Sequence, residues 1–126
     1  MEINAPDVVA EVSAAFARYE AALISNDVAV LDELFWAGPH TIRYGIAENL
    51  YGPKEIAAFR AGRPSVGLDR VLSRTQITAY GPDMAIAATL FHRPNAPGKT
   101  GRQMQTWTRM PEGWRVVAAH VSLIDS

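Results

Sequence analysis

The chain has 126 residues, with 12 basic and 13 acidic side chains and a formal net charge of -1 at pH 7. This length predicts one domain spanning residues 1–126, and the balanced charge argues against nucleic acid or an anionic membrane as a partner. The sequence has no cysteine, which excludes disulfides, thiolate catalysis and sulfur-ligated metal sites. It contains no apolar run of bilayer length and no signal-peptide pattern, so we expect a cytoplasmic location.

The first half of the chain predicts three helices and a short strand. Apolar side chains recur at helical spacing from Val9 to Leu23, a stripe that includes Tyr19, and Asp7 is a suitable N-cap. The pair Asn26–Asp27 interrupts this stripe and begins a second helix. The expected helices span residues 7–25, 28–35 and 54–61, and the run "TIRYG" is a strand at residues 41–45.

The second half predicts four long strands separated by turns. The turn signals are "GPD", "PNAPGK" and "PEG", which combine proline and glycine with polar residues. The strands are expected at residues 68–80, 84–93, 101–110 and 114–124. Helices followed by a meander of strands predict an α+β fold, in which a curved antiparallel sheet wraps the three helices. Such a sheet, closed on its open side by helices, forms a cone with a central pocket.

Several stretches of the sequence resemble a known family. The run "GRQMQTWTRMPEGWRVVAAHVS" (101–122) is similar to the last hairpin of SnoaL-like, nuclear transport factor 2-like proteins, which lines their cavity. The runs "RYEAALISND", "LDELFW" and "TIRYGIAENLYGPKEIAAFRAGR" resemble the AtzH and HpxZ group of that superfamily, small proteins linked to cyanuric acid and oxalurate breakdown. The resemblance covers nearly the whole chain and implies the cone-shaped SnoaL-like fold. The superfamily alone does not determine the chemistry, because its members include isomerases, dehydratases, cyclases and non-enzymatic modules.

The register of the last hairpin decides which side chains share a face of the sheet. With Glu112–Gly113 as a two-residue turn, Gln105 lies opposite His120. A three-residue loop shifts the pairing by one residue and places Met104 opposite His120 instead. We favour the first register because it gathers the polar groups, and the resemblance points their face toward the cavity. That face then carries the candidate substrate-binding residues Gln103, Gln105, Trp107, His120 and Ser122.

Arg43 is the first catalytic candidate. An arginine on a short strand belongs more often to a sheet edge or a structural ion pair than to a binding site. Gly45 shares its strand face and leaves space beside the guanidinium, and the apolar flanks favour an internal strand. A guanidinium directed into a cavity binds a planar carboxylate through two parallel hydrogen bonds. Arg43 is therefore predicted to hold a carboxylated ligand, whereas Arg60, Arg63 and Arg74 are interpreted as solvated surface residues.

Tyr19 is the second catalytic candidate. A tyrosine in the apolar stripe of a helix is usually a core residue whose hydroxyl bonds to a backbone carbonyl. The resemblance implies instead that this hydroxyl reaches the cavity near Arg43, whose charge makes the phenol a stronger donor. A donor aimed at a developing oxyanion stabilises the transition state for attack on an amide carbonyl.

His120 is the candidate general base, because an imidazole titrates near neutrality. The alternative is a half-buried histidine that bonds to a neighbouring strand. His40 and His92 are expected on loop or strand surfaces. The three histidines lack the spacing of a zinc site, and serine-hydrolase and phosphate-loop motifs are absent. We therefore expect neither a metal nor another cofactor.

The resemblance implies a cofactor-free amide hydrolase that acts on a small carboxylated urea, converting 1,3-dicarboxyurea to allophanate with release of ammonia. In that reaction Arg43 holds a substrate carboxylate, and Tyr19 polarises the carbonyl or directs water. Gln105 and His120 orient the amide end. Placing groups in this way contributes several kcal/mol to lowering the barrier.

Two other functions stay open. A non-catalytic protein that binds a small anion, or supports a partner amidase, requires the same pocket without a base. A SnoaL-type isomerase or lyase requires an acidic residue in the cavity, and the sequence favours none of Glu20, Asp32, Glu48 and Asp69. Met104 and Leu90 stand where the resemblance implies more polar residues, a departure that bears on the substrate rather than on the fold.

A homodimer is also expected. The outer face of the sheet is predicted to carry apolar side chains that a monomer would expose to water. These residues are Val117, Ala119, Val121 and Leu123.

Overall fold

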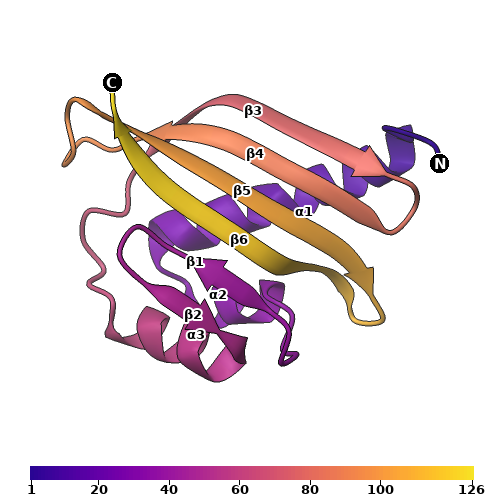
Figure 1. Ribbon diagram of the computed structural model, residues 1–126, viewed down its shortest axis with the longest axis horizontal. Coiled ribbons are helices and arrows are strands. Elements are labelled where there is room, and N and C mark those ends of the chain that lie inside the picture. Colours follow the sequence, from indigo (N-terminus) through magenta and orange to yellow (C-terminus); the bar gives the residue numbers. More distant parts are fainter.

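The computed structural model describes residues 1–126 and contains three helices and six strands (Figure 1). The helices are α1 (Pro6–Ser25), α2 (Val28–Leu34) and α3 (Gly52–Gly62). The strands are β1 (Ile42–Tyr44), β2 (Asn49–Tyr51), β3 (Val71–Tyr80), β4 (Met84–His92), β5 (Lys99–Met110) and β6 (Gly113–Asp125). They form one curved sheet in the order β2-β1-β6-β5-β4-β3, with the helices on one face. The expected α+β fold with a sheet wrapped on three helices is confirmed.

The first two helices begin and end where the sequence provides boundaries. Pro6 occupies the first turn of α1, where its missing N–H removes no helical hydrogen bond. Asn26 ends α1 in the left-handed conformation, with a φ of 54°. Asp27 caps α2 by accepting a hydrogen bond from the N–H of Val30 at 3.3 Å, whereas the predicted cap Asp7 lies inside the first turn of α1. None of the three helices has the length and apolarity that a membrane span requires.

The core lies between α1 and the inner face of the sheet. The apolar stripe of α1, which includes Val12, Phe16 and Leu23, is buried as its spacing predicts. β4 presents the small residues Ala85 and Ala87 to this core. Small side chains on one strand leave room for a large neighbour, and β5 contributes the fully buried Trp107.

The short strand β2 was not predicted, and it makes β1 an internal strand. β1 pairs antiparallel with β2 on one side and parallel with β6 on the other. The sheet is therefore mixed rather than wholly antiparallel. Arg43 lies between Leu50 and Ala119 in these ladders, so the strand that carries it is internal, as its apolar flanks predict.

The β5–β6 hairpin differs from its predicted register. Its two turn residues are Pro111–Glu112, one position earlier than expected, and Met110 pairs with Gly113. Gly113 has a φ of 126°, a conformation that glycine adopts more readily than other residues. A bulge then leaves Val117 without a partner in β5, which shifts the remaining pairs by one residue.

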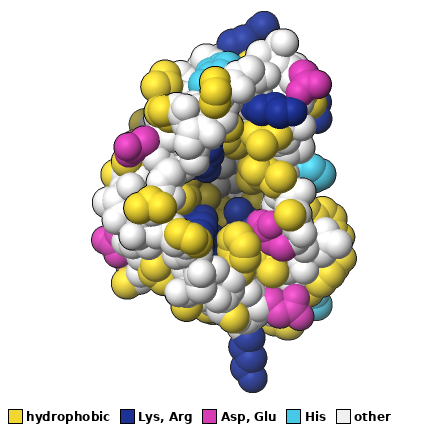
Figure 2. All heavy atoms as spheres, turned by 90° about the vertical axis from the view of Figure 1, so that its left-hand side faces the viewer, with side chains coloured by type: hydrophobic (Ala, Val, Ile, Leu, Met, Phe, Trp, Pro, Cys, Tyr) yellow, Lys and Arg dark blue, Asp and Glu magenta, His cyan; other side chains and the backbone are white.

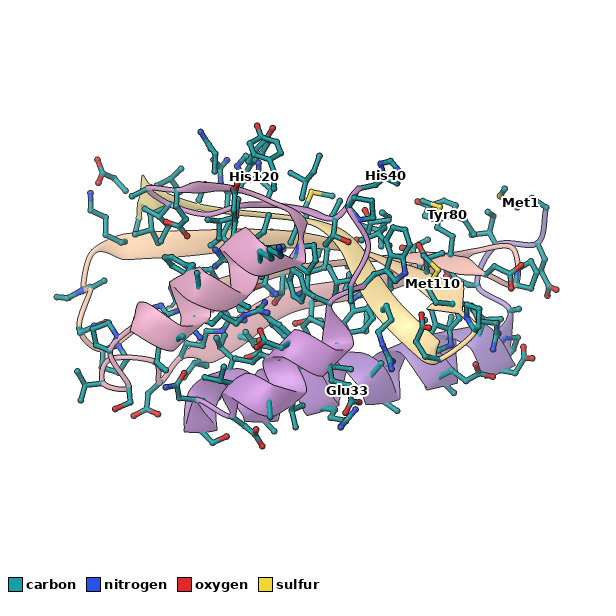
Figure 3. The ribbon with its side chains drawn as sticks, turned by 90° about the horizontal axis from the view of Figure 1, so that it is seen from below. Met1, Glu33, His40, Tyr80, Met110 and His120 are labelled. Atoms are coloured by element: carbon teal, nitrogen blue, oxygen red, sulfur yellow. The ribbon has the colours of Figure 1, made fainter.

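The shift separates the candidate substrate-binding residues. Met104 lies opposite His120, which was the less favoured alternative. Because successive side chains of a strand point to opposite faces, His120 and Ser122 lie on the outer face, whereas Gln103 and Gln105 face the helices. Figure 3 shows His120 on the side of the sheet away from the helices. The prediction that one face carries all of these residues is wrong.

The same shift changes the composition of the outer face. Ala119 packs against the core, and Val121 lines a cavity beneath the sheet. Leu123 pairs with Gly101 on this inner side, so Ala119, Val121 and Leu123 do not form the outer face that was predicted for them. Shallow hollows of the actual outer face are lined by Ile42, Tyr44, Ala88, Leu90, Met104 and Ala118.

We predict that Gly101→Ala destabilises the fold. Gly101 pairs with Phe91, and a Cβ at residue 101 would lie 2.1 Å from the Phe91 ring. Overpacking of this kind costs roughly 1–3 kcal/mol, which urea titration would measure as a lower free energy of unfolding. Gly62→Ala is the control, because a Cβ there meets open space. Equal stability of the two variants would contradict the close packing of Gly101 on Phe91.

Candidate functional site

A cavity of about 290 Å³ opens at one end of the molecule. Its walls come from α1, α3, β1, β5 and β6, and from the loops that follow β1, α3 and β4. Figure 2 shows this end as a hollow, with Lys or Arg side chains in its walls and acidic side chains nearby. Its polar lining residues include Tyr19, Arg43, Glu48, Arg63, Arg70, Arg93 and Gln103.

Both predicted catalytic residues line this cavity. Tyr19 comes from the buried face of α1, is 4% exposed, and lies with its ring centroid 6.2 Å from that of Phe35. No protein group forms a hydrogen bond with its hydroxyl. Arg43 comes from β1, and its side chain is 11% exposed. The structure therefore brings a phenol and a guanidinium, 24 positions apart in the sequence, to the same hollow.

Arg43 already has an acidic partner. Its Nη1 donates to Oε1 of Glu48 at 2.7 Å, so part of its charge is balanced within the protein. A Cβ at Gly45 would lie 1.7 Å from that oxygen, which means that the space predicted beside the guanidinium holds the Glu48 carboxylate. The Nε and Nη2 edge of Arg43 makes no hydrogen bond to protein. A planar carboxylate can therefore approach that edge.

Arg70 is held in a buried ion pair. Its Nε donates to Oε2 of Glu20 at 3.1 Å, and its Nη2 donates to the other oxygen of the same carboxylate. Nη2 also donates to Oε1 of Gln103 at 3.0 Å. These bonds fix the amide of Gln103 with its nitrogen directed away from Arg70, and this nitrogen is buried without a hydrogen-bond partner.

Arg63 has no acidic partner. It follows α3, and its Nε and Nη2 atoms are buried without any hydrogen-bond partner. Burial lowers the pKa of Arg63 from its ordinary value, an effect that negative charge on Tyr19 opposes and the charge of Arg43 reinforces. The Arg63 guanidinium is therefore a charged donor that lacks an acceptor.

Arg93 likewise has no carboxylate partner. It follows β4, and its Nη1 donates to the backbone carbonyl of Gly67 at 3.0 Å. Burial lowers the pKa of Arg93, and the positive charge of Arg70 adds to this shift. A carbonyl satisfies one donor but carries no full charge, so the positive charge of Arg93 is not neutralised.

Two phenylalanine rings support these four arginines in pairs. The guanidinium carbons of Arg43 and Arg63 lie 5.1 Å and 6.0 Å from the centroid of Phe59. Those of Arg70 and Arg93 lie 4.6 Å and 5.2 Å from the centroid of Phe91. A cation over an aromatic face is attracted by the ring quadrupole. We call these groups the Phe59 wall (Arg43, Phe59, Arg63) and the Phe91 wall (Arg70, Phe91, Arg93, with Gln103).

Arg60 adds a fifth charge behind Tyr19. It is 2% exposed, lies over the Phe35 ring at 4.2 Å, and donates to the Leu31 carbonyl at 3.2 Å and to Asp32 at 3.1 Å. Burial lowers the pKa of Arg60, and negative charge on Tyr19 would oppose that shift. The interpretation of Arg60 as a solvated surface residue is wrong.

Arg63 was also interpreted as a solvated surface residue, and its buried nitrogens contradict that interpretation. Arg74 is exposed, as predicted. Sequence reasoning did not single out Arg70 or Arg93 at all. The sequence did contain one signal for Arg70. Glu20 lies beside the apolar stripe of α1, and a carboxylate at a buried helix position requires a cationic partner.

The other candidates lie outside the cavity. Trp107 is buried in the core and donates its Nε1–H to Oε1 of Gln105 at 3.1 Å. His120 packs edge-on against Tyr44 on the outer face, with ring centroids 6.2 Å apart. Ser122 shares that face and accepts a hydrogen bond from Arg102 at 3.2 Å. His120 and Ser122 therefore cannot contact a ligand in the cavity, and the structure gathers no three His, Asp or Glu side chains that could hold a metal ion.

Comparison with known proteins places the chain among relatives of the same fold. The AtzH-like family model matches residues 1–126. A crystal structure of a DUF3225-family protein of unknown function from Pectobacterium atrosepticum is 64% identical, with a TM-score of 0.95 over 98% of this chain and 95% of that chain. A cystatin-like fold protein from Burkholderia xenovorans is 49% identical, with a TM-score of 0.95 over 100% and 98%.

More distant structures share the fold alone. An NTF2-like protein with a cystatin-like fold from Novosphingobium aromaticivorans is 21% identical, with a TM-score of 0.69 over 95% of this chain and 84% of that chain. No curated protein matches the chain. The fold is therefore the α+β cystatin-like, NTF2-like fold, as the resemblance implied.

We predict that Glu20→Ala strongly destabilises the protein. The Arg70 side chain is 1% exposed, and removing its partner leaves a buried charge uncompensated. Breaking a buried ion pair in this way costs about 3–5 kcal/mol, measured as the free energy of unfolding. Glu33→Ala is the matched control, because the Arg18–Glu33 pair is exposed and surface pairs contribute little. Similar losses in both variants would contradict a structural role specific to Glu20.

Proposed function

Because the chain belongs to the AtzH-like family, we propose that it is a cofactor-free amide hydrolase for a small carboxylated urea. The proposed substrate is 1,3-dicarboxyurea, within cyanuric acid or related nitrogen catabolism in the cytoplasm. One observation carries the proposal: the hydroxyl of Tyr19 has no protein partner in a cavity lined by four arginines. A phenol in such positive surroundings is suited to donate a hydrogen bond to a substrate oxygen or nitrogen.

Atom balance corrects the expected products. 1,3-Dicarboxyurea and allophanate contain the same number of nitrogens, so ammonia cannot be released when one becomes the other. The bond between a urea nitrogen and a terminal carboxylate carbon breaks instead, and the nitrogen gains a proton. The carboxyl group leaves as bicarbonate when water is taken up, which is a hydrolysis of this C–N bond, or directly as carbon dioxide, which is a decarboxylation. Ammonia would be released only from a substrate with a terminal amide, such as oxalurate or biuret.

The cavity residues have distinct roles in this proposal. The free edge of Arg43 holds a substrate carboxylate through two hydrogen bonds. Tyr19 donates to the urea carbonyl oxygen or to the nitrogen that gains a proton, and the surrounding guanidiniums stabilise negative charge on the phenol oxygen. Glu48 keeps Arg43 in place. The chain holds these groups before substrate arrives, which reduces the entropy lost on reaching the transition state.

A non-catalytic anion-binding protein is the second candidate. The observation that favours it is the position of His120, the expected base, on the outer face of the sheet. Glu48, the one carboxylate that lines the cavity, is engaged by Arg43, and Glu20 is engaged by Arg70. Such a protein would bind the same carboxylates without turnover, alone or in support of a partner amidase.

We predict turnover by the purified protein and its loss in Tyr19→Phe. The assay follows bicarbonate from 1,3-dicarboxyurea and ammonia from oxalurate and biuret, each corrected for the uncatalysed rate. Removing a donor to the transition state lowers kcat by ~10² to 10³. Tyr80→Phe is the control, because Tyr80 is an exposed residue at the other end of the molecule. Tight binding of these compounds without any turnover in the natural sequence would refute the hydrolase and favour the anion-binding protein.

We also propose that two copies associate through the outer face of the sheet. Met104 lies at the centre of this face and is 56% exposed, which is costly for an apolar side chain unless a partner covers it. Met104→Glu should convert a dimer to a monomer in light-scattering measurements. Ile24→Glu is the control, because Ile24 is an exposed apolar residue of α1 on the helical side. If light scattering shows that the protein with its natural sequence is a monomer, this proposal is wrong.

A further inference from the structure

The charges around the cavity divide evenly between its two walls. On the Phe59 wall Arg43 is paired with Glu48, and Arg63 has no acidic partner. On the Phe91 wall Arg70 is paired with Glu20, and Arg93 bonds only to a backbone carbonyl. Each wall therefore retains one uncompensated positive charge.

Buried donors without partners show the same division. Nε and Nη2 of Arg63 are unpaired on the Phe59 wall, and Nε2 of Gln103 is unpaired on the Phe91 wall. A buried donor without an acceptor costs about 1–3 kcal/mol, and more when it is charged. Native proteins rarely retain such groups unless something else satisfies them. Arg63 and Gln103 line the same cavity. A ligand with a hydrogen-bond acceptor at each end would therefore satisfy the unpaired donors of both walls.

We propose that this cavity is a two-ended site for a small dicarboxylate. Arg63, together with the free edge of Arg43, receives one carboxylate, and Arg93, together with the Gln103 amide, receives the other. The inference rests on the proposed function only for the nature of the ligand as a carboxylated urea. It adds Arg63, Arg93 and Gln103 as the residues that select two separated negative charges.

A ligand with a single carboxylate does not match this arrangement. It would compensate one wall and leave the positive charge of the other wall, with its unpaired donors, without an acceptor. A compact dianion such as sulfate carries the same total charge at one point, so we expect it to satisfy one wall and not both. The site is therefore expected to select for the separation of the charges as well as for their number.

Glu20 has a positioning role in this site. It holds Arg70, and Arg70 in turn holds the carbonyl oxygen of Gln103. This series of hydrogen bonds fixes the orientation of the amide, because the oxygen is already engaged and the nitrogen is left without an acceptor in the protein. The Phe91 wall thus contains a neutral donor, the Gln103 amide, as well as the charged Arg93.

Isothermal titration calorimetry with the full chain tests the proposal. The probes are glutarate, whose two carboxylates have a spacing similar to that of 1,3-dicarboxyurea, its monoamide glutaramate, and sulfate. Glutarate and glutaramate have the same length and differ by one charge. Hydrogen bonds to a charged group predict that glutarate binds more tightly on the order of 10- to 100-fold. Sulfate should bind more weakly than glutarate at the same ionic strength.

Variants at each wall assign the preference to residues. Arg63→Met should abolish the preference for glutarate while changing glutaramate affinity little, because a single carboxylate can still bind at the Phe91 wall. Gln103→Glu keeps the shape of the side chain but removes the donor and adds a negative charge to the Phe91 wall, next to Arg70, so it should abolish the preference independently. Arg74→Met is the control, because it removes the same charge from an exposed position.

The outcomes separate this inference from the proposed hydrolase. Loss of the preference in both wall variants but not in the control supports the two-ended site, whether or not turnover occurs. A preference that survives in folded Arg63→Met or in folded Gln103→Glu overturns it, even if the protein hydrolyses 1,3-dicarboxyurea. Sulfate binding as tight as glutarate binding also overturns it. If circular dichroism shows that Arg63→Met does not fold, Arg63→Gln replaces it, because it also removes the charge but keeps a polar side chain at this position.

Discussion

Positive charge buried around one small cavity is the constraint on which the rest of this structure depends. Burying a guanidinium is costly unless a carboxylate and further hydrogen bonds compensate it. Here Glu20 and Glu48 compensate Arg70 and Arg43, and they come from α1 and from the loop after β1. Arg63 and Arg93 line the same cavity without a carboxylate partner, so its positive charge exceeds its negative charge. An anion that binds only the folded protein would balance this charge and stabilise the fold by mass action.

Aromatic rings let the chain hold these arginines without more carboxylates. Phe59 and Phe91 each carry two guanidiniums, and Phe35 carries Arg60 behind Tyr19. A ring attracts a cation and excludes water, yet it does not neutralise the charge as a carboxylate does. The rings thus keep the guanidiniums in place and leave their charge available to a ligand. Side chains fixed before binding lose less entropy when the ligand arrives.

The elements could be predicted from the sequence because their signals are local. Helical spacing in α1, the break at Asn26 and the turns rich in proline and glycine each depend on a few neighbouring residues. The register of the last hairpin could not be predicted from the sequence. It depends on a turn that begins at Pro111, one residue before the predicted turn, and on a bulge at Val117. Nothing in the local pattern distinguishes those choices, and a shift of one residue turns every later side chain to the opposite face. His120 was lost from the predicted site for that reason alone.

The candidate site was only partly predictable because its charges come from distant segments. Tyr19 and Arg43 could be singled out, since a polar group stood in an apolar pattern at each position. Arg63 and Arg93 lie among prolines and glycines beyond the ends of α3 and β4, where an arginine is ordinarily solvated. Their partial burial depends on the tertiary packing that brings both loops to the same hollow. Arg63 and Arg93, which give the cavity its excess positive charge, are therefore the site residues with the weakest sequence signal. The acceptor that such donors require belongs to a ligand, so the sequence contains no partner residue that would reveal them.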